Sequence, residues 1–532
     1  MSSAEIIKNG KAVIGIEFGS TRIKALLIGD DRAPLAAGVY DWQNELLDGV
    51  WTYSLENVRK GLRECFADLM KNVEEKYGVK LETASAIGIS AMMHGYLVFD
   101  KSDEQLVPFR TWRNTMTEEA ADRLTEEFSF NIPQRWSIAH LYQAILNKEP
   151  HVKDIAFMTT LAGYVHYLLT GEKFIGTGDA SGIFPIAQDT CDYDGEMLAK
   201  FDELARGTAF GTKLKDILPQ IVPVGECAGK LTEEGAKLLD PTGTFKAGVP
   251  FCPPEGDAQT GMAATNSITP KTGNVSAGTS IFSMIVLEEK LKSVHREIDI
   301  VTTPCGAPVA MVHCNSCTSD LDAWFGVFGE LLKEAGCDMP KGKLYDMLYG
   351  LAAEGDADCS GVISYNYFAG EPVTGVKDGK LLMMRDPESV FSIRNLVRSL
   401  VYSCIASLKA GMDILTEQEH VKLERIYAHG GFFKTPVPSQ SFLSAALGAD
   451  VTLMQTAGEG GAWGIALLAD YMAVRDDGET LEDYLNNRVF ADMKGNTVSP
   501  QKKNVDGINE YMKNYLSGLE AVKAAVSEKQ KG

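Results

Sequence analysis

The sequence contains two short turns made of glycine and hydroxyl residues, each between two apolar runs. They are Gly19-Ser20-Thr21 and Gly278-Thr279-Ser280. Such a turn exposes backbone N–H groups and hydroxyls that can bind phosphate oxygens without a lysine, and glycine lets the backbone come close to the anion. One such turn is more often an ordinary hairpin turn. Two of them, each opening a similar segment, predict a clamp for a polyphosphate.

Two common nucleotide-binding motifs are absent from the sequence. It has no G-x-x-x-x-G-K-[ST] segment, which argues against a P-loop enzyme. It has no strand–GxGxxG–helix unit, which argues against a Rossmann dinucleotide site.

An aspartate in the middle of the chain is the candidate general base. Asp257 follows Gly256 at a predicted strand-to-helix turn. An aspartate placed there can remove the proton from a substrate hydroxyl. It can equally cap the N-terminus of the following helix. The local sequence alone favours the cap.

Two further segments carry side chains suited to a sugar. His94 lies in Met92–Gly95, between two predicted strands, where its ring can hydrogen-bond to hydroxyls. In Trp112-Arg113-Asn114, the indole offers a flat apolar face for a sugar, and its two neighbours offer polar groups. The alternatives are a structural turn histidine and a half-buried loop tryptophan.

Two glycine clusters near the C-terminal end could face a planar ring. Gly430, Gly431 and Phe432 form the first, and 458–464 contains the second; they flank a short predicted strand at Val451–Leu453. Backbone without side chains can pack flat against a base such as adenine. The alternative is two glycine-rich turns with no ligand.

The N-terminal part of the chain predicts a β-hairpin followed by helices and strands. Apolar runs at 12–18 and 23–28 form the hairpin, and 35–40 adds a third strand. Apolar residues at helical spacing over Leu55–Tyr77 predict an amphipathic helix. Further strands are predicted at 84–90 and 96–99, and further helices at 117–128, 137–146 and 159–169. This order is an α/β pattern.

The middle of the chain repeats this pattern. Gly248–Cys252 predicts a short strand before Pro253-Pro254, a candidate domain junction. After a helix at 259–265, strand, hydroxyl turn and strand recur over Gly273–Val286, an echo of the first hairpin. Later helices are predicted at 320–335, 393–417, 464–474 and 507–526. We expect an N-terminal lobe over 1–253, a C-terminal lobe over 254–480 and a C-terminal helical extension over 481–532.

The composition of the 532 residues, 45% hydrophobic and 23% charged, is that of a globular chain. The net charge of −21 argues against nucleic acid or an anionic membrane as the main partner. No apolar run is long enough to span a bilayer, and Met1–Gly10 lacks the features of a signal peptide. A cytoplasmic location with reduced cysteines is therefore expected. Cys314 and Cys317 form a C-x-x-C pair without the second pair that a zinc site needs, so we expect packed thiols.

Taken in order along the chain, these segments resemble the motifs of the FGGY family of carbohydrate kinases. The resemblance covers residues 13–469. GIEFGSTRIKALL (15–27) and SAGTS (276–280) are similar to the two phosphate motifs, and GISAMMHGYLVFD (88–100) is similar to the pentulose-kinase segment G-x-S-x-Q-M-H-G. GDASG (178–182) is similar to S-D-A-S-G, EGDAQTGM (255–262) to G-G-D-x-Q, and AHGGF (428–432) with EGGAWGIALLA (459–469) to the adenosine motif and its helix. Each motif is weak alone, but their order makes the resemblance strong.

The resemblance implies the α/β fold of actin, Hsp70 and hexokinase, which is ribonuclease H-like. Two lobes, each with a five-stranded mixed sheet and flanking helices, would hold ATP and the sugar in the cleft between them. The implied activity is ATP-dependent phosphorylation of a ketose or polyol hydroxyl, with Mg²⁺ neutralising charge on the γ-phosphoryl group.

The resemblance also implies roles for individual residues. Asp257 would be the base. The sugar would contact His94, Met93, Trp112, Asp257 and Gln259; the ATP phosphates would bind Gly19, Ser20, Thr21, Gly278, Thr279 and Ser280; and adenosine would bind Gly430, Gly431 and Phe432. Met93-His94 favours a pentulose such as xylulose or ribulose.

The sequence departs from the family pattern at three places. Glu17 stands where the family usually has an aspartate near the metal, so Glu17 is the predicted metal residue. TWRNTMT (111–117) lacks the usual W-N-D-x-R order, and NYFAGEPVTG (366–375) lacks the arginine that normally follows Gly-Glu. The altered Trp112 loop leaves the particular sugar open.

Two other functions are alternatives at this point. An actin- or Hsp70-like ATPase or assembly protein shares the phosphate hairpins, but it has no sugar pocket of the kind that His94, Trp112 and Asp257 predict. A cysteine-ligated ATPase activator of the same superfamily needs a cluster site, which a lone C-x-x-C does not provide. The expected partners are a small-molecule sugar and ATP, with no nucleic acid or membrane, and a homodimer is one option for assembly.

Overall fold

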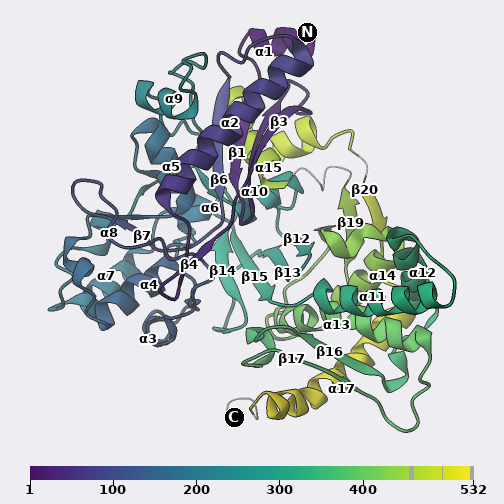
Figure 1. Cartoon of the computed structure of the whole chain (residues 1–532). Helices are drawn as coiled ribbons and strands as arrows, with labels where there is room; N and C mark the ends of the chain where they lie inside the picture. The colour runs from purple at the N-terminus through teal and green to yellow at the C-terminus, as the bar shows by residue number, and fades with distance from the viewer. Residues whose placement is uncertain (455–459, 494, 528–532) are drawn as a thin grey trace. The chain divides into compact units, whose positions relative to one another are not determined.

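The computed structural model describes residues 1–454, 460–493 and 495–527 (Figure 1). The chain groups into two compact units, each of which combines helices with β-sheet. Unit 1 comprises Met1–Ile268, Ile300–Val309 and Glu459–Asp492, and unit 2 comprises Thr269–Asp299, Ala310–Gly458 and Met493–Gly532.

Unit 1 is built on a mixed five-stranded sheet in the order β11-β6-β1-β2-β3. β1 (Val13–Phe18) and β2 (Arg22–Ile28) form the predicted antiparallel hairpin, and β3 (Pro34–Asp41) pairs antiparallel with β2. β6 (Ala86–Ala91) and β11 (Glu255–Gly256) continue the sheet in parallel beyond β1. The expected five-stranded mixed sheet is therefore confirmed in this unit.

Helices cover both faces of this sheet. α2 (Leu55–Tyr77) has the bounds predicted from its apolar spacing, and a Cβ at Gly38 would lie 2.2 Å from a carbonyl oxygen of this helix. α15 (Gly460–Val474) is equally close on the other side, since a Cβ at Gly15 would lie 2.1 Å from one of its carbonyl oxygens. The strand register places Gly15 and Gly38 on opposite faces. α10 (Asp257–Ala264) packs against α15.

The remaining elements of unit 1 surround this core. They are α1 (Ser3–Lys8), β4 (Glu45–Leu47), β5 (Val50–Thr52), β7 (Leu97–Phe99), α3 (Glu118–Phe128), α4 (Ser137–Leu146), β8 (Phe157–Thr159), α5 (Leu161–Thr170), β9 (Phe174–Gly176), α6 (Thr177–Ala180), α7 (Gly195–Ala205), α8 (Leu214–Ile217), β10 (Gln220–Val222), α9 (Glu233–Leu239), most of β14 (Asp299–Thr302) and α16 (Leu481–Tyr484).

Unit 2 repeats the hairpin arrangement. β12 (Thr272–Ala277) and β13 (Ile281–Val286) are antiparallel, and β18 (Arg425–His429) and β19 (Asp450–Met454) continue in parallel beyond β12. Six strands of the unit lie in the order β15-β13-β12-β18-β19-β20. The first five reproduce the order β3-β2-β1-β6-β11 of unit 1, which confirms the predicted echo. The expectation of five strands is wrong here, because β20 (Gly495–Val498) adds an antiparallel edge beside β19.

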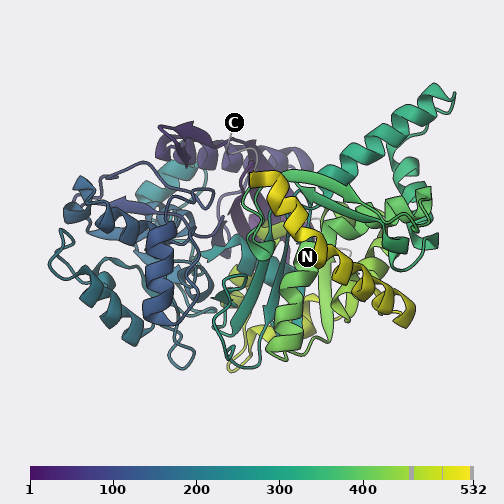
Figure 2. The same cartoon turned by 90° about the horizontal axis from the view of Figure 1, so that it is seen from below.

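The C-terminal helix completes unit 2. α17 (Lys502–Ser527) packs against β16, β17 and α13 (Figure 2, yellow). Tyr515 of α17 is fully buried, and its hydroxyl lies 2.6 Å from that of Tyr367. The other elements of the unit are β15 (Pro308–Cys314), α11 (Thr318–Glu334), α12 (Lys341–Glu354), β16 (Ile363–Tyr367), β17 (Lys380–Met384), α13 (Ile393–Asp413) and α14 (Pro436–Leu447).

The segment before Asp257 differs from the expectation. Gly248–Cys252 makes isolated bridges and is not a regular strand. Prolines at 250, 253 and 254 have no N–H to donate to a ladder, so pairing is interrupted. The predicted lobe boundaries at 253 and 480 stay predictions, whereas the compact units divide the chain after 268, 299, 309, 458 and 492. Within the described ranges, no helix is long and apolar enough to cross a membrane.

Candidate active site

Asp257 is the first residue of α10, directly after β11. Gly256 occupies the cap position, so Asp257 is not the N-cap residue. Its half-buried carboxylate accepts a 3.3 Å hydrogen bond from the backbone N–H of Met93. Burial raises the pKa of Asp257 to about 6, although backbone N–H groups partly offset this effect. The carboxylate is therefore ionised at neutral pH, yet it is a stronger base than an ordinary aspartate.

Met93 and Gln259 lie beside Asp257. A Cβ at Gly256 would stand 2.4 Å from Cγ of Met93 and 2.6 Å from Oε1 of Gln259, so only glycine fits between them. Gln259 is fully buried and donates from Nε2 to the carbonyl oxygen of Thr302 at 3.0 Å. The structure thus brings three of the predicted sugar-site residues together, and their contact with a sugar stays a prediction.

His94 follows Met93 in a left-handed backbone conformation with φ of +65°. Its ring stacks on Trp136 with 5.9 Å between centroids, and its Nδ1 lies 3.1 Å from the carbonyl oxygen of Gly182. Since a carbonyl can only accept, Nδ1 carries the proton of this bond. A Cβ at Gly182 would lie 2.9 Å from both Nδ1 of His94 and Cε of Met93. The GDASG segment therefore contacts the predicted sugar residues.

Two buried carboxyl groups lie near Asp257, and the sequence predicts no role for either of them. Glu255 accepts hydrogen bonds from the N–H groups of Gly178 and Asp179 at 3.3 and 2.8 Å. Asp179 accepts a 2.6 Å bond from the hydroxyl of Thr160. Burial raises the pKa of Glu255 to about 8 and that of Asp179 to about 7, and each of the two also feels a neighbouring carboxylate. Both residues belong to recognised motifs, but only the fold reveals their burial and partners.

The Trp112 loop is tied to the body of unit 1. Trp112 packs, half-buried, against the hydrophobic core of the unit. Asn114 is buried and bonds to both the N–H and the carbonyl oxygen of Trp51. Arg113 is exposed and stacks over the Trp51 ring at 4.2 Å. These contacts give Asn114 a structural role, and the predicted sugar contact of Trp112 stays a prediction.

Glu17 lies on β1, on the face covered by α15. Its carboxylate accepts a 3.0 Å bond from the N–H of Ala462, the third residue of α15, and so binds the positive end of that helix. A Cβ at Gly461 would stand 2.4 Å from Oε1 of Glu17, so the close approach requires glycine there. Burial and the nearby charge of Asp257 raise the pKa of Glu17 to about 7.

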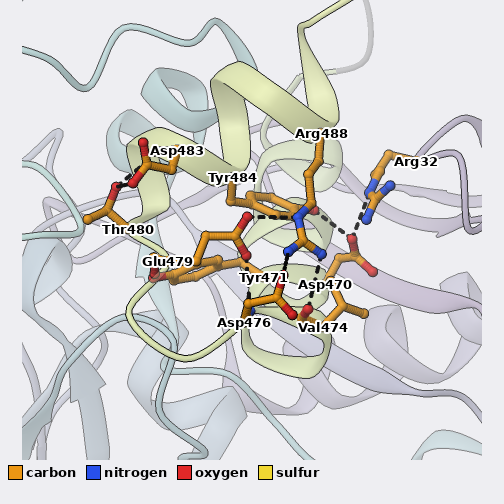
Figure 3. A network of polar contacts seen from close by, with 10 residues as sticks. All are labelled: Arg32, Asp470, Tyr471, Val474, Asp476, Glu479, Thr480, Asp483, Tyr484 and Arg488. Carbon is orange, nitrogen blue, oxygen red and sulfur yellow. Dashed lines mark hydrogen bonds and ion pairs between the residues drawn. The ribbon is translucent and has the colours of Figure 1, made fainter.

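The other end of α15 is fixed by a polar network (Figure 3). Asp470 accepts a 2.9 Å bond from Arg32 and a 2.6 Å bond from the hydroxyl of Tyr484. Beyond the helix, Arg488 binds Glu479 at 2.7 Å and also pairs with Asp476. The helix that meets Glu17 is therefore anchored at both ends within unit 1.

The first glycine–hydroxyl turn is supported by two aromatic side chains. The indole N–H of Trp42 donates to the carbonyl oxygen of Gly19 at 2.7 Å, and the hydroxyl of Tyr53 donates to that of Ser20 at 2.6 Å. In a trans peptide the next N–H points away from the carbonyl. The N–H groups of Ser20 and Thr21 therefore point away from the supporting side chains, and both residues are exposed.

The second turn has the same design in unit 2. The carbonyl oxygen of Gly278 accepts from the hydroxyl of Thr318 at 2.9 Å, and that of Thr279 accepts from the N–H of Cys317 at 2.9 Å. The N–H groups of Thr279 and Ser280 consequently point away from the start of α11. Cys317 is buried behind the turn, as expected for a packed thiol.

Two of the predicted adenosine residues have exposed backbone, and the third is buried in the core. Gly430 has φ of +108°, and a Cβ there would lie 2.2 Å from the carbonyl oxygen of Ala277, so its backbone packs on the end of β12. Gly430 and Gly431 are exposed, whereas Phe432 is buried edge-on against Tyr349. Phe432 is therefore placed to anchor the segment, and an adenosine contact stays a prediction for all three. In the second glycine cluster, Gly458 and Glu459 lie outside the described residues.

Comparison with known proteins identifies the family. Residues 12–263 match the N-terminal domain of the FGGY family of carbohydrate kinases, and residues 273–473 match its C-terminal domain. The chain belongs to the FGGY family of carbohydrate kinases. FGGY kinases transfer a phosphoryl group to an alcohol group and use ATP, typically with Mg²⁺. The predicted family and enzyme class are confirmed.

Individual relatives of this FGGY kinase differ in their substrates. A xylulose kinase from Haemophilus influenzae is 22% identical over 474 residues, which cover 84% of this chain and 91% of that protein. A ligand-bound xylulose kinase and a gluconate kinase, both from Lactobacillus acidophilus, have TM-scores of 0.77 and 0.78 at 16% identity. Each alignment covers 97% of this chain and 99% of the other. They confirm the actin/hexokinase-like α/β fold of this FGGY kinase but not its substrate.

The donor set in unit 1 fits the Mg²⁺ that is typical of FGGY kinases. Mg²⁺ is commonly held by one or two carboxylates together with substrate phosphates. Glu17 supplies one such carboxylate, and it lies close enough to Asp257 for the two charges to interact. Within the described part of the chain, no group of three or more His, Cys, Asp or Glu side chains forms a closed metal site.

Proposed function

We propose that this FGGY kinase transfers the γ-phosphoryl group of ATP to a hydroxyl of a ketose, with a pentulose such as xylulose or ribulose as the acceptor. The observation that carries this proposal is the position of Asp257. A carboxylate with a pKa of about 6 begins α10, bound to the backbone of the Met93-His94 segment. A base beside two predicted sugar residues is what phosphorylation of a sugar hydroxyl requires.

Asp257 accepts the proton of the attacking hydroxyl in the proposed mechanism. The sugar oxygen forms a bond to the γ-phosphorus as the bond to the β–γ bridging oxygen breaks, and ADP leaves. His94 and Gln259 orient the sugar, so that its hydroxyl faces the carboxylate. The proton then passes from Asp257 to solvent. Mg²⁺ bound with ATP would neutralise the phosphate charge, and Glu17 is the residue that would hold it.

The two hairpin turns bind phosphate oxygens in this proposal. Their N–H groups at Ser20, Thr21, Thr279 and Ser280 point away from the donors that fix the turn carbonyls. Fixed N–H dipoles need no reorganisation when negative charge develops. The exposed backbone of Gly430 would lie against adenosine.

The charge around Asp257 favours a neutral acceptor. The charge of Asp257 raises the pKa values of both Glu17 and Asp179, which shows that like charges already interact here. A sugar acid would bring one more negative charge toward these carboxyl groups. We therefore expect a neutral ketose to be preferred to gluconate.

An acceptor panel tests the proposal. Release of ADP is measured with D-xylulose, D-ribulose, their L-isomers, glycerol and gluconate, each against a blank without acceptor. We expect one pentulose to give the highest kcat/KM and gluconate to give little stimulation. A kcat/KM for glycerol or gluconate above that of every pentulose would contradict the proposed acceptor class.

The pH profile is expected to show an acid limb set by Asp257. The base must be ionised, so kcat/KM for the sugar should rise with pH through about 6 and then level off. An ordinary aspartate, with a pKa near 4, would give a level profile over this range. Measurement of kcat/KM from pH 5 to 8 at saturating MgATP distinguishes the two. A profile that is flat down to pH 5 would remove Asp257 as the titrating base.

A cytoplasmic location and a homodimer stay proposals that rest on the sequence alone.

A further inference from the structure

A chain of hydrogen bonds joins the buried Glu255 to His94. The carboxylate of Glu255 accepts from the N–H of Asp179 at 2.8 Å. The carbonyl oxygen of Asp179 accepts from the N–H of Gly182 at 3.0 Å. The carbonyl oxygen of Gly182 in turn accepts from Nδ1 of His94 at 3.1 Å. Three successive contacts thus run from an internal carboxylate to a predicted sugar-binding ring.

The space around Glu255 is shaped for its carboxylate. A Cβ at Gly176 would lie 2.3 Å from Oε1 of Glu255, and one at Gly178 would lie 2.6 Å from Oε2. Glu255 is only 1% exposed, and within the described residues no cation contributes to the shift of its pKa. It accepts hydrogen bonds from the N–H groups of Gly178 and Asp179, and the backbone of Gly256 also stabilises its charge. This carboxyl group therefore holds the start of the segment 178–182, which we call the GDASG loop.

The other end of the loop has a separate support. The hydroxyl of Ser181 accepts from the N–H of Thr302 at 3.0 Å, and the hydroxyl of Thr302 donates to the carbonyl oxygen of Thr177 at 3.2 Å. The carbonyl oxygen of Thr302 also accepts a hydrogen bond from Nε2 of Gln259. Thr302 holds Ser181 and Gln259 in place. Glu255 holds Asp179, whose carbonyl oxygen accepts from the N–H of Gly182. The two supports thus have separable effects.

We propose that Glu255 is a positioning residue for sugar recognition, which acts through the GDASG loop on the orientation of His94. The proposal deepens the proposed function and rests on it for the role of His94. Glu255 touches no substrate in this account. Its side-chain oxygens set the position of Asp179 and thereby that of the Gly182 carbonyl oxygen, and that oxygen fixes both the tilt of the His94 ring and the proton on Nδ1. Sugar affinity should therefore depend on Glu255, whereas ATP affinity should not.

Kinetics of Glu255→Gln and Glu255→Ala test the proposal. With the pentulose that the panel selects, we expect the sugar KM to rise about tenfold in Glu255→Ala and less in Glu255→Gln, which keeps one acceptor oxygen. The KM for ATP should stay within about twofold of the wild type, and kcat should fall less than kcat/KM for the sugar.

Glu419→Gln is the matched control. Glu419 is also a buried glutamate, and it accepts from the N–H groups of Lys292 and Ser293, but it belongs to unit 2 and lies outside the proposed sugar residues. Its replacement should lower thermal stability and leave the sugar KM unchanged. Gly182→Ala is the second test variant, because its Cβ would press on His94 and Met93 while the side chain of Glu255 is kept. It should raise the sugar KM in the same direction as Glu255→Ala. It also keeps the proposal testable if Glu255→Ala does not fold.

An NMR measurement without sugar separates this proposal from the proposed function. In ¹⁵N spectra of the wild type, His94 should show a protonated Nδ1, assigned by loss of its signal in His94→Asn. In Glu255→Gln the ring nitrogen shifts should move toward a mixture of tautomers. Unchanged His94 shifts in a folded Glu255→Gln, or an unchanged sugar KM in Glu255→Ala or Gly182→Ala, would overturn the positioning role. Inactivity of the wild type toward every sugar, with His94 shifts that respond to Glu255, would overturn the proposed function alone.

Discussion

Replacement of Asp257 by asparagine is expected to lower kcat by about 10²–10⁴-fold, the usual contribution of a positioned general base. The amide keeps the shape of the side chain and can still accept the N–H of Met93, but it cannot take the hydroxyl proton. ATP affinity should be retained, because the proposed nucleotide contacts are at the hairpin turns and Gly430. Steady-state kinetics and calorimetric titration with ATP measure the two effects separately.

Asp240→Asn is a suitable control for that variant. Asp240 is another buried aspartate of unit 1, and its carboxylate accepts the N–H groups of Thr242 and Phe245 in a loop of its own. Its replacement removes the same charge and leaves the proposed base in place, so kcat should change by less than about twofold. A folded Asp257→Asn with a kcat near that of the wild type would exclude Asp257 as the base.

Shortening Glu17 to aspartate is expected to lower kcat/KM for MgATP by about tenfold or more. The side chain of Glu17 now reaches the N–H of Ala462 at 3.0 Å, and aspartate is one methylene shorter. Loss of this bond would leave the N-terminus of α15 without the carboxylate that stabilises its positive end. This helix end lies near Glu17, which comes shortly before the first glycine–hydroxyl turn. Both the kcat/KM measured at varied MgATP and the thermal unfolding temperature should fall. Activity equal to or above that of the wild type would show that the longer side chain is not needed.

Glu17→Gln separates the metal role from the helix contact. Glutamine keeps the length and one acceptor oxygen, so α15 should remain bound and thermal stability should change less than in Glu17→Asp. Glutamine is a poor Mg²⁺ ligand compared with a carboxylate, so the apparent Mg²⁺ requirement should rise. If Glu17→Gln leaves both turnover and the Mg²⁺ requirement unchanged, Glu17 has no metal role and serves α15 alone.

The local part of the fold could be predicted from the sequence. The two hairpins and α2 follow from apolar runs, glycine–hydroxyl turns and helical spacing, all within short stretches of chain. The assignment of α15 and residues 300–309 to unit 1 could not be predicted, because it depends on contacts between segments that are far apart in the sequence. The edge strand β20 was missed for the same reason.

The candidate site was predictable where a motif names the residue. Asp257, Met93 and His94 were singled out by their motifs, and the structure brings them together. Glu255 and Asp179 belong to two of the motifs, but a carboxyl group that binds backbone N–H groups leaves no pattern in the sequence. The contact of Glu17 with α15 was likewise hidden, since its partner is a main-chain N–H.

The most direct test of the central claim is ³¹P NMR of the protein mixed with MgATP, with and without the pentulose selected by the panel. If Asp257 accepts the proton of a sugar hydroxyl that attacks ATP, the γ-phosphate signal should be replaced by the signal of a sugar phosphate monoester. This should happen in step with ADP formation, and only when the sugar is present. Release of the γ-phosphate as inorganic phosphate, at the same rate with and without sugar, would contradict the account.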